Sequence, residues 1–488
     1  MTSMFVFLAF LGLHSGFKQM CEASDLPGLK IRLSTKGLDY VSNAALDVMT
    51  SRLSGQSIDD YHGQSGKTKY DITGVRITSF NKPHSEATVA PGSGITWTLS
   101  GGSVSIKGDW HYKYRQNRFI KLSDSGSFEA SVSGLDIRIS ITIGMDDSGQ
   151  PTIHTTGCSS EVGSADVHLH GGGSWFYNIF DSAIERSVKR NLKNKLCDAA
   201  KLSIDKEGVE RMKSLNLQVY FFANHLMLDY RLVAPPKFTT NYLESFHKGE
   251  VFLKGDSREA PFQPFPLSGD EPSESHMMTF WASDYILNTL GNLLQRYGLV
   301  HYKLTNKDLE AYGKPHLLNT ICPGHVCIGK FIDGVSKQFP NSSVIVHMVS
   351  TQGDFPRFTM LAGELRGHIS GMAFFSVRTP NGSHVHMFRA HVNLTMSLGV
   401  RMGDDRVKAK VANFRTKMKL VHTNIKAITE PELDAFFKLI ADTWIIPKLN
   451  ELGDIGFELP IFDDFHFVNP EIKIQKGAMQ LLVDFKYL

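Results

Sequence analysis

The chain has 488 residues, of which 42% are hydrophobic and 21% are charged. This is ordinary globular composition, so it excludes a disordered or fibrous protein, and the length predicts two or more domains. A formal net charge of +3 is nearly neutral for this length, which excludes bulk electrostatic capture of nucleic acid and requires any anion-binding site to be local.

The first residues predict a secretory signal peptide. An apolar run from Met4 to Leu13 is followed by a small-residue exit that ends at Ala23. This run is too short to span a bilayer, and the usual basic segment before it is missing. We expect residues 1–23 to be removed and the mature chain to be secreted to the extracellular space, without a membrane span.

Cysteines and glycosylation sequons agree with secretion. Beyond the signal peptide the chain has four cysteines: Cys158, Cys197, Cys322 and Cys327. An even number in an oxidising compartment predicts two disulfides. The turn Pro-Gly-His-Val would bring the last two cysteines together; His316 and His325 lie nearby, so a zinc site is the alternative, and secretion favours the disulfide. Asn-x-Ser/Thr sequons predict glycosylation at Asn341, Asn381 and Asn393.

The first half of the chain predicts helices and antiparallel strands. A strand-like run at residues 29–33 precedes a helix with one apolar stripe, which opens near Leu38 and stops near Gly55. Alternation of apolar and polar residues over residues 70–170 predicts antiparallel strands. A second long helix is expected over residues 175–204, with a basic face of the kind that is usually solvated.

The second half repeats this order of helices and strands after a change in composition. Residues 234–273 are rich in proline and predict a linker with embedded strands near residues 242–254. A helix at residues 283–298, strands over 300–425, a long helix at 430–453 and strands at 472–487 follow. The repeated order predicts an α+β protein with two related domains. We place the domains at residues 24–233 and 274–488.

Motifs of catalysis and metal binding are incomplete. The chain has no Gly-x-Ser-x-Gly. Residues 65–68 imitate the end of a phosphate-binding loop, but Tyr61 stands in place of its first glycine. His168 and His170 alternate along a strand without a third ligand at diagnostic spacing. We therefore predict neither an enzyme nor a metal protein.

Several segments share an order and spacing found in one known family. They are IRLSTKGLDYVSNAAL, DSGQPTI followed by CSSEVGSADVHLHG, SWFYNIFDSAIERSVKRNLKNKLC, SDYILNTLGNLLQRYG, IIPKLNE, GFELP and LLVDFKYL. Together they resemble the family of bactericidal/permeability-increasing protein, lipopolysaccharide-binding protein and the plasma lipid-transfer proteins. The resemblance implies a boomerang of two barrels, each with long helices packed in a highly twisted antiparallel sheet, joined by a central sheet. It also implies a disulfide from Cys158 to Cys197.

The resemblance further implies a phospholipid in each barrel, with its acyl chains in an apolar tunnel, and no other cofactor. Helical apolar stripes are compatible with tunnel walls, although such stripes are more often plain core. The expected tunnel residues are Val41, Ala45, Val48, Ile179, Ala183, Leu287, Leu290, Phe437 and Ile440.

The stretch GDWHYKYRQNRFIK at residues 108–121 is similar to the family's GKWK-type hairpin, at the tip where lipopolysaccharide is thought to dock. Residues 107–121 hold five cations and one acid, Asp109, which stands where the family pattern has a cation. Lysine and arginine suit the phosphates of lipid A, and aromatic rings, including Tyr112 and Tyr114, suit a lipid–water boundary. The expected lipopolysaccharide-binding residues are Lys67, Lys69, Lys107, Trp110, Lys113, Arg115, Arg118 and Lys121.

We therefore expect a secreted innate-immune protein that binds lipopolysaccharide on the bacterial outer-membrane surface, with antibacterial action left open. A carrier of phospholipid or neutral lipid is the main alternative, and an extracellular scaffold or storage protein with a vestigial site is another. Residues 24–240 hold 25 Lys and Arg against 22 Asp and Glu. This small excess differs from the strongly cationic body expected of a membrane killer, and it favours the carrier.

Overall fold

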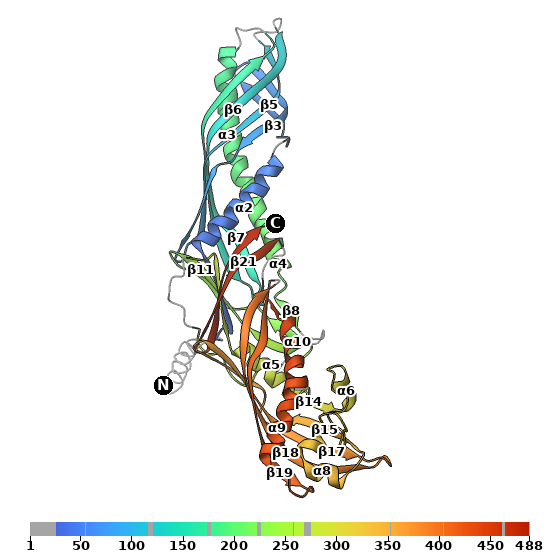
Figure 1. Ribbon diagram of the computed structural model, residues 1–488. Coiled ribbons are helices and arrows are strands. Elements are labelled where there is room, and N and C mark those ends of the chain that lie inside the picture. The colour runs from blue at the N-terminus through green and yellow to red at the C-terminus, as the bar shows by residue number, and fades with distance from the viewer. Residues whose placement is uncertain are drawn as a thin grey trace, which may run out of the picture.

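The structure is a computed structural model that describes residues 26–53, 55–115, 121–172, 177–221, 226–256, 258–267, 275–351, 353–403, 405–460 and 464–487. The predicted signal peptide and the predicted binding residue Arg118 lie outside these ranges. The described chain is elongated, with the first half of the sequence at one end and the second half at the other (Figure 1). Within these ranges no helix is long and apolar enough to cross a membrane.

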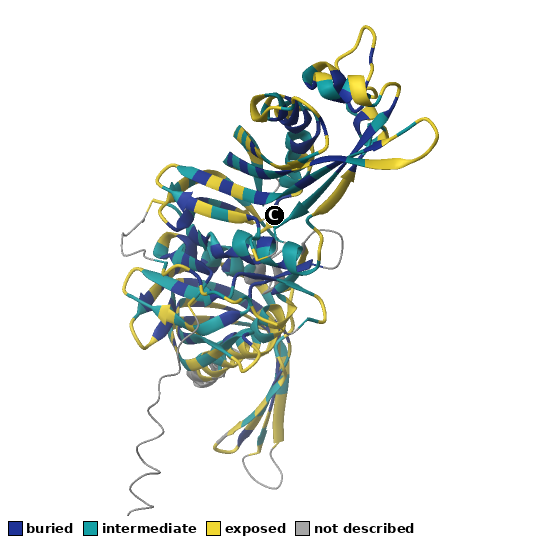
Figure 2. Ribbon diagram, turned by 90° about the horizontal axis from the view of Figure 1, so that it is seen from below, coloured by how far each residue is buried: buried dark blue, intermediate teal, exposed yellow. Residues whose placement is uncertain are grey.

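The first barrel is built on a twisted antiparallel sheet. Its strands are β2 (Tyr61–Ser65), β3 (Thr68–Asn81), β4 (His84–Ala90), β5 (Gly94–Arg115), β6 (Lys121–Met145) and β7 (Pro151–His170). The predicted alternation is confirmed, and it gives the bands of buried and exposed residues along the strands (Figure 2). Such alternation leaves one face of each strand apolar and able to pack against helices.

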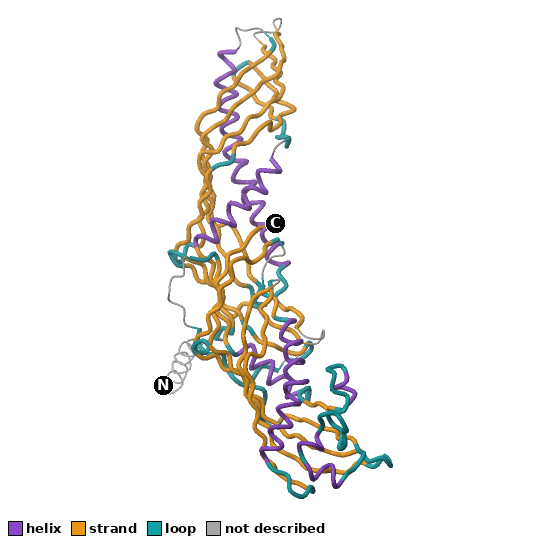
Figure 3. The backbone as a smooth tube through the Cα atoms, viewed as in Figure 1, coloured by secondary structure: helices purple, strands orange, loops and turns teal. Residues whose placement is uncertain are grey.

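Long helices run lengthwise beside these strands (Figure 3). They are α2 (Thr35–Leu53) and α3 (Tyr177–Leu202), and α3 continues through the π-helical turn η2 (Ser203–Gly208) into α4 (Val209–Ser214). Their packing on the sheet forms two apolar clusters, one around Phe128 and one around Ile139. A disulfide joins Cys158 on β7 to Cys197 on α3, with the two Cα atoms 5.8 Å apart, which confirms the bridge that the resemblance implied.

The second barrel repeats this arrangement. Its sheet contains β14 (His301–Leu304), β15 (Ser343–Ser350), β16 (Arg357–Leu361), β17 (Glu364–Arg378), β18 (His384–Gly403), β19 (Arg406–Thr423) and β20 (Phe457–Glu458). Its long helices are α5 (Tyr285–Arg296) and α9 (Glu430–Ile440), which continues through the π-helical turn η3 (Ala441–Ile445) into α10 (Ile446–Ile455). The start of α9 is encoded locally, because Thr429 and Glu432 form a capping box that satisfies free backbone N–H groups.

Part of the second barrel differs from the sequence prediction. Strands were expected throughout residues 300–425, but this region also holds the short helices α6 (Asn306–Glu310), α7 (Ile328–Phe331) and α8 (Asp333–Gln338). The signal for α6 is a capping box formed by Thr305 and Asp308. The disulfide between Cys322 and Cys327, predicted from spacing, closes the loop that leads into α7.

A central sheet joins the barrels. It contains, in order, β10 (Leu232–Phe238), β11 (Tyr242–His247), β1 (Leu29–Ser34), β13 (Met278–Ser283), β22 (Ala478–Tyr487) and β21 (Phe465–Gln475), so both ends of the described chain meet here. Two prolines of the predicted linker, Pro235 and Pro236, lie on β10, at the edge of the sheet where a missing N–H is tolerated. Inside the sheet, Arg32 donates to the Glu244 carboxylate at 2.7 Å, and Lys30 lies 3.3 Å from the same oxygen.

Candidate functional site

Cations from neighbouring strands gather at the free end of the first barrel. Strand β5 pairs with β3 and β6, and this register places Lys113 directly opposite Lys69, and Arg115 directly opposite Lys121. The carbonyl of Lys67, in the turn before β3, accepts a hydrogen bond from the Arg115 N–H at 3.2 Å. The structure therefore brings together five of the predicted binding residues, which we call the cationic tip.

The cations of the tip face solvent and oppose one another. Among the described residues, none of Lys69, Lys113, Arg115 and Lys121 has an ion-pair partner, and all four are exposed. Like charges directly opposite each other on adjacent strands destabilise a sheet. Two such pairs therefore repel each other at one end of the barrel, and a bound anion would offset this repulsion.

The acids nearest the tip along the strands are Asp71, whose carboxylate lies 2.7 Å from the His62 Nδ1, and Asp124, which accepts from the Ser125 N–H at 2.8 Å. Asp59 and Asp60 lie further along the barrel. The Asp59 carboxylate accepts a hydrogen bond from Lys195 on α3 at 2.9 Å, and this bond holds the pKa of Asp59 below its usual value. Asp60 accepts from the Gly74 N–H at 3.0 Å.

Lys107 and Asp109 lie further along β5, where Lys107 is about 20 Å from Lys113 at the rise of a β-strand. Lys107 is therefore not part of the cationic tip.

The aromatic side chains predicted for a lipid–water boundary point into the barrel. Trp110 is only 8% exposed, stacks on Tyr112 with ring centroids 5.9 Å apart, and donates its indole N–H to the Ser127 carbonyl at 2.9 Å. The expectation of a surface tryptophan is thus wrong, because the even-numbered residues of β5 face inward here. Burial, followed by the Asp124 charge, raises the pKa of Tyr112.

The apolar side chains next to the cations are Tyr114 and Leu122, which point to the opposite face of the sheet, and Tyr114 packs against the cluster around Phe128. They are directly opposite each other across β5 and β6, one residue from the cations, and Leu122 is 41% exposed. Sequence reasoning named Tyr114 but missed Leu122. The signal was the alternation itself, since a neighbour of an outward cation on a strand must point to the other face.

The second barrel contains an apolar cavity of about 760 Å³. It lies between α5, α9 and α10 and the inner faces of β17, β18 and β19, with further wall from the central strands. Among the described residues that line it there is no Asp, Glu, Lys or Arg. Leu299 and Tyr302 line the cavity and are 57% and 38% exposed, so the cavity reaches the surface there.

Three of the expected tunnel residues in this barrel lie on the cavity wall: Leu287, Leu290 and Phe437. Ile440 does not; it is fully buried in the closed core. Ile440 follows Phe437 by three residues, so it is rotated about 60° around the helix from that side chain. Much of the remaining wall is the alternating apolar set of β18, including Leu394 and Met396, which sequence reasoning did not single out.

The tunnel residues expected in the first barrel are less informative. Val41 is half-buried, and Ala45 packs against the cluster around Ile139. The side chains of Val48, Ile179 and Ala183 lie outside the described part of the structure. A tunnel in this barrel therefore stays a prediction.

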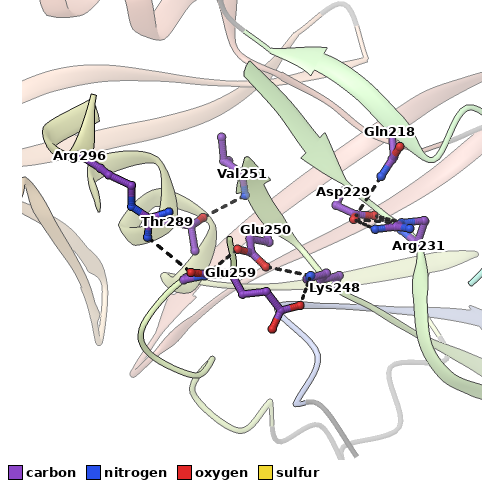
Figure 4. Close-up of polar contacts among 10 residues, drawn as sticks. Gln218, Asp229, Arg231, Lys248, Glu250, Val251, Glu259, Thr289 and Arg296 are labelled. Carbon is purple, nitrogen blue, oxygen red and sulfur yellow. Dashed lines mark hydrogen bonds and ion pairs between the residues drawn. The ribbon is translucent and has the colours of Figure 1, made fainter. Parts of the chain in front are cut away.

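A polar network ties the linker to the wall of the cavity (Figure 4). The Val251 N–H, on β12 (Glu250–Leu253), donates to Thr289 on α5 at 3.0 Å. Beside it Lys248 lies 3.2 Å from Glu250 and 2.9 Å from Glu259. Strand β12 pairs with β9 (Leu226–Asp229) and β9 with β8 (Gln218–Phe221), and Leu226, Leu228 and Leu253 of β9 and β12 complete the cavity wall.

The predicted sequons lie in different environments. Asn341 and Asn381 are exposed in turns that flank strands, whereas Asn393 is half-buried within β18. Glycosylation of these three sites stays a prediction.

Known proteins resemble the chain over nearly its whole length. The sequence patterns described as LBP / BPI / CETP family, N-terminal domain and C-terminal domain, match residues 37–212 and 222–487. A bactericidal permeability-increasing protein of Sebastes schlegelii is 25% identical over 466 residues, which cover 94% of this chain and 95% of that protein. The corresponding protein of Rattus norvegicus is 27% identical over 469 residues, or 94% of this chain and 93% of that one.

A lipopolysaccharide-binding protein of Homo sapiens is 24% identical over 474 residues, which cover 95% of this chain and 94% of that protein. A crystal structure of lipopolysaccharide binding protein matches with a TM-score of 0.62 and 24% identity, covering 95% of this chain and 99% of the other. This likeness confirms the predicted boomerang of two barrels.

Proposed function

Because the chain belongs to the LBP / BPI / CETP family, we propose that it is a secreted protein that binds lipopolysaccharide through the cationic tip of its first barrel. The family comprises lipid-binding and lipid-transfer proteins, so the protein is not an enzyme. Relatives named for lipopolysaccharide binding or for bactericidal action support the choice of ligand. The two disulfides support an oxidising, extracellular location.

The observation that carries this proposal is the pair of like-charge oppositions at the tip, Lys69 with Lys113 and Arg115 with Lys121. Phosphates on lipid A would accept charge-assisted hydrogen bonds from these cations and remove their mutual repulsion. Exposed Leu122 would then contact the acyl region, where each buried methylene contributes about 0.8 kcal/mol. Attachment to the bacterial outer membrane would follow from the same contacts.

The test is neutralisation of the tip without loss of side-chain length. A Lys69→Gln, Lys113→Gln, Arg115→Gln variant should bind immobilised lipid A about 10- to 100-fold more weakly, because each charge-assisted bond contributes on the order of 1 kcal/mol or more. The matched control is Arg415→Gln, Lys417→Gln, Lys419→Gln on the second barrel, which removes the same charges. Equal binding by the tip variant and the parent would refute the site.

A lipid carrier is the second candidate, and the cavity favours it. A space of about 760 Å³ without charged lining suits acyl chains rather than head groups. We propose that a phospholipid or neutral lipid occupies it and that its polar end lies near Leu299 and Tyr302. Mass spectrometry of lipid extracted from the purified protein, together with vesicle-to-vesicle transfer, tests this role. A protein that carries no lipid and transfers none would exclude it.

A further inference from the structure

A second row of cations lies on the outer face of β19, at the opposite end of the molecule from the tip (Figure 1). Arg415, Lys417 and Lys419 alternate along the strand and are all exposed, while Thr416 and Met418 between them are not. Residues 406–423 contain six Lys and Arg and no Asp or Glu. We call Arg415, Lys417 and Lys419 the cationic row.

The cationic row is not neutralised by its surroundings. In the described part of the chain, none of its three members has an ion-pair partner. The register with β18 places uncharged or weakly basic side chains opposite them: Thr395, Asn393 and His391. These amide, hydroxyl and imidazole groups add hydrogen-bonding capacity, and the nearest carboxylates, Asp434 and Glu430, are bonded to the backbone at the edge of β19.

Lysines on edge strands often serve to block aggregation, and here that role is already filled. The edge N–H groups of Met418 and Leu420 donate to Asp434 at 2.5 Å and to Glu430 at 3.1 Å, both on α9. These two acids are therefore engaged with the backbone of β19. The cations project from the face of the sheet and are not needed to protect its edge.

The neighbourhood of the row selects the kind of polyanion. The cations of the row have no exposed apolar or aromatic side chain between them; exposed Val421 follows two residues beyond Lys419 on the same strand. Single-stranded nucleic acid would need aromatic rings for base stacking. The cations repeat about every 7 Å along a strand, so they match a linear array of anionic groups.

We propose that the cationic row docks a linear sulfated polysaccharide. Sulfate oxygens accept charge-assisted hydrogen bonds from Lys and Arg, and the neighbouring Asn393 and Thr395 can bond to sugar hydroxyls. This surface is separate from the lipopolysaccharide site, so the two proposals stand or fall independently. Asn393 lies directly opposite Lys417 and belongs to a sequon, so a glycan there would cover the row.

The test uses full-length protein expressed in a host without N-glycosylation, so that no glycan shields the face and Asn393 stays in place. Immobilised heparan sulfate is the probe, and anionic phospholipid vesicles and a single-stranded oligonucleotide are the comparison ligands. The Arg415→Gln, Lys417→Gln, Lys419→Gln variant should lose at least about tenfold in affinity for heparan sulfate. The tip variant, with the same change of charge, should lose less than about twofold, since its cations lie on the other barrel.

An Arg415→Lys variant retains the charge and should bind like the parent, and thermal melting should show that all variants fold. Unchanged affinity of the row variant for heparan sulfate would overturn the proposal. So would a loss that appears with the tip variant instead. A loss by the row variant that is confined to vesicles or to the oligonucleotide would assign the surface to that other class of ligand and overturn it as well.

Discussion

The free end of the first barrel and the interior of the second differ in which face of their strands carries the functional side chains. At the first end, β5 and its neighbours point Lys69, Lys113 and Arg115 outward and place like charges opposite each other. In the second barrel, β18 points Leu394 and Met396 inward around a cavity that the helices do not fill. The same helix-and-sheet architecture thus supports charge recognition at one site and apolar enclosure at another, and each should be alterable alone.

Removing each disulfide should give the largest difference in unfolding free energy between the two barrels. Cys158 and Cys197 are 39 residues apart, whereas Cys322 and Cys327 are 5 apart. Closing a loop of the first length removes unfolded-state entropy worth about 4 kcal/mol, and the shorter loop about 2 kcal/mol. Denaturant unfolding of the two double Cys→Ser variants should show this order. Equal losses, or a larger loss in the second barrel, would contradict it.

The joint between the barrels should be sensitive to acid. His247 on β11 is buried, and its Nδ1 donates to the Tyr230 carbonyl at 2.6 Å; burial lowers its pKa from 6.5 to about 4. The unfolded chain therefore binds the proton more tightly. The free energy of unfolding is therefore highest above pH 6.5. It falls by about 3 kcal/mol in total as the pH drops toward 4, because the unfolded chain takes up the proton first.

The measurement is the free energy of unfolding as a function of pH for the parent and for His247→Gln. The variant should lack this part of the slope between pH 6.5 and 4, while the other histidines contribute equally to both proteins. Parallel curves would show that His247 titrates normally in the folded state.

The smallest expected change in unfolding free energy comes from placing a larger side chain on the cavity wall. Leu290→Trp adds volume to the wall of an open cavity, so we expect a change in unfolding free energy below about 1 kcal/mol. Ile139→Trp adds similar volume to a fully buried position in the first barrel and should cost about 1–3 kcal/mol or more. A larger loss for Leu290→Trp would mean that the cavity is closed in solution.

Leu290→Trp also separates the two candidate activities. Lipid recovered from the purified variant should fall relative to the parent, because the acyl-chain space is occupied. Binding to lipid A should stay unchanged, since the cationic tip lies on the other barrel.

Much of the architecture was readable in the sequence. Alternation predicted the strands of residues 70–170, and apolar stripes predicted the long helices, because both patterns report which face is buried. The short helices α6 to α8 were missed, since pieces of 4 to 6 residues are too short for periodicity to be read. The inward rotation of Trp110 and the exclusion of Ile440 from the cavity depend on strand register and helix phase, which composition does not contain.

The arrangement of the cationic tip also depends on strand pairing that the sequence does not show. The sequence located Lys113 and Arg115 between strands, but the opposition of Lys69 to Lys113 requires the pairing of β3 with β5. The cavity likewise combines α5 with β18 and β19, which lie far along the chain from it, so a local pattern identified only its helical wall.

The most direct test of the account is the binding of endotoxin-free protein to immobilised lipid A at low and physiological salt, with phosphatidylcholine as the comparison surface. We predict selective binding to lipid A that weakens as salt rises, because exposed charges are screened over about 8–10 Å at these ionic strengths. Equal binding to both surfaces, or none, would contradict it and leave the lipid carrier as the better description.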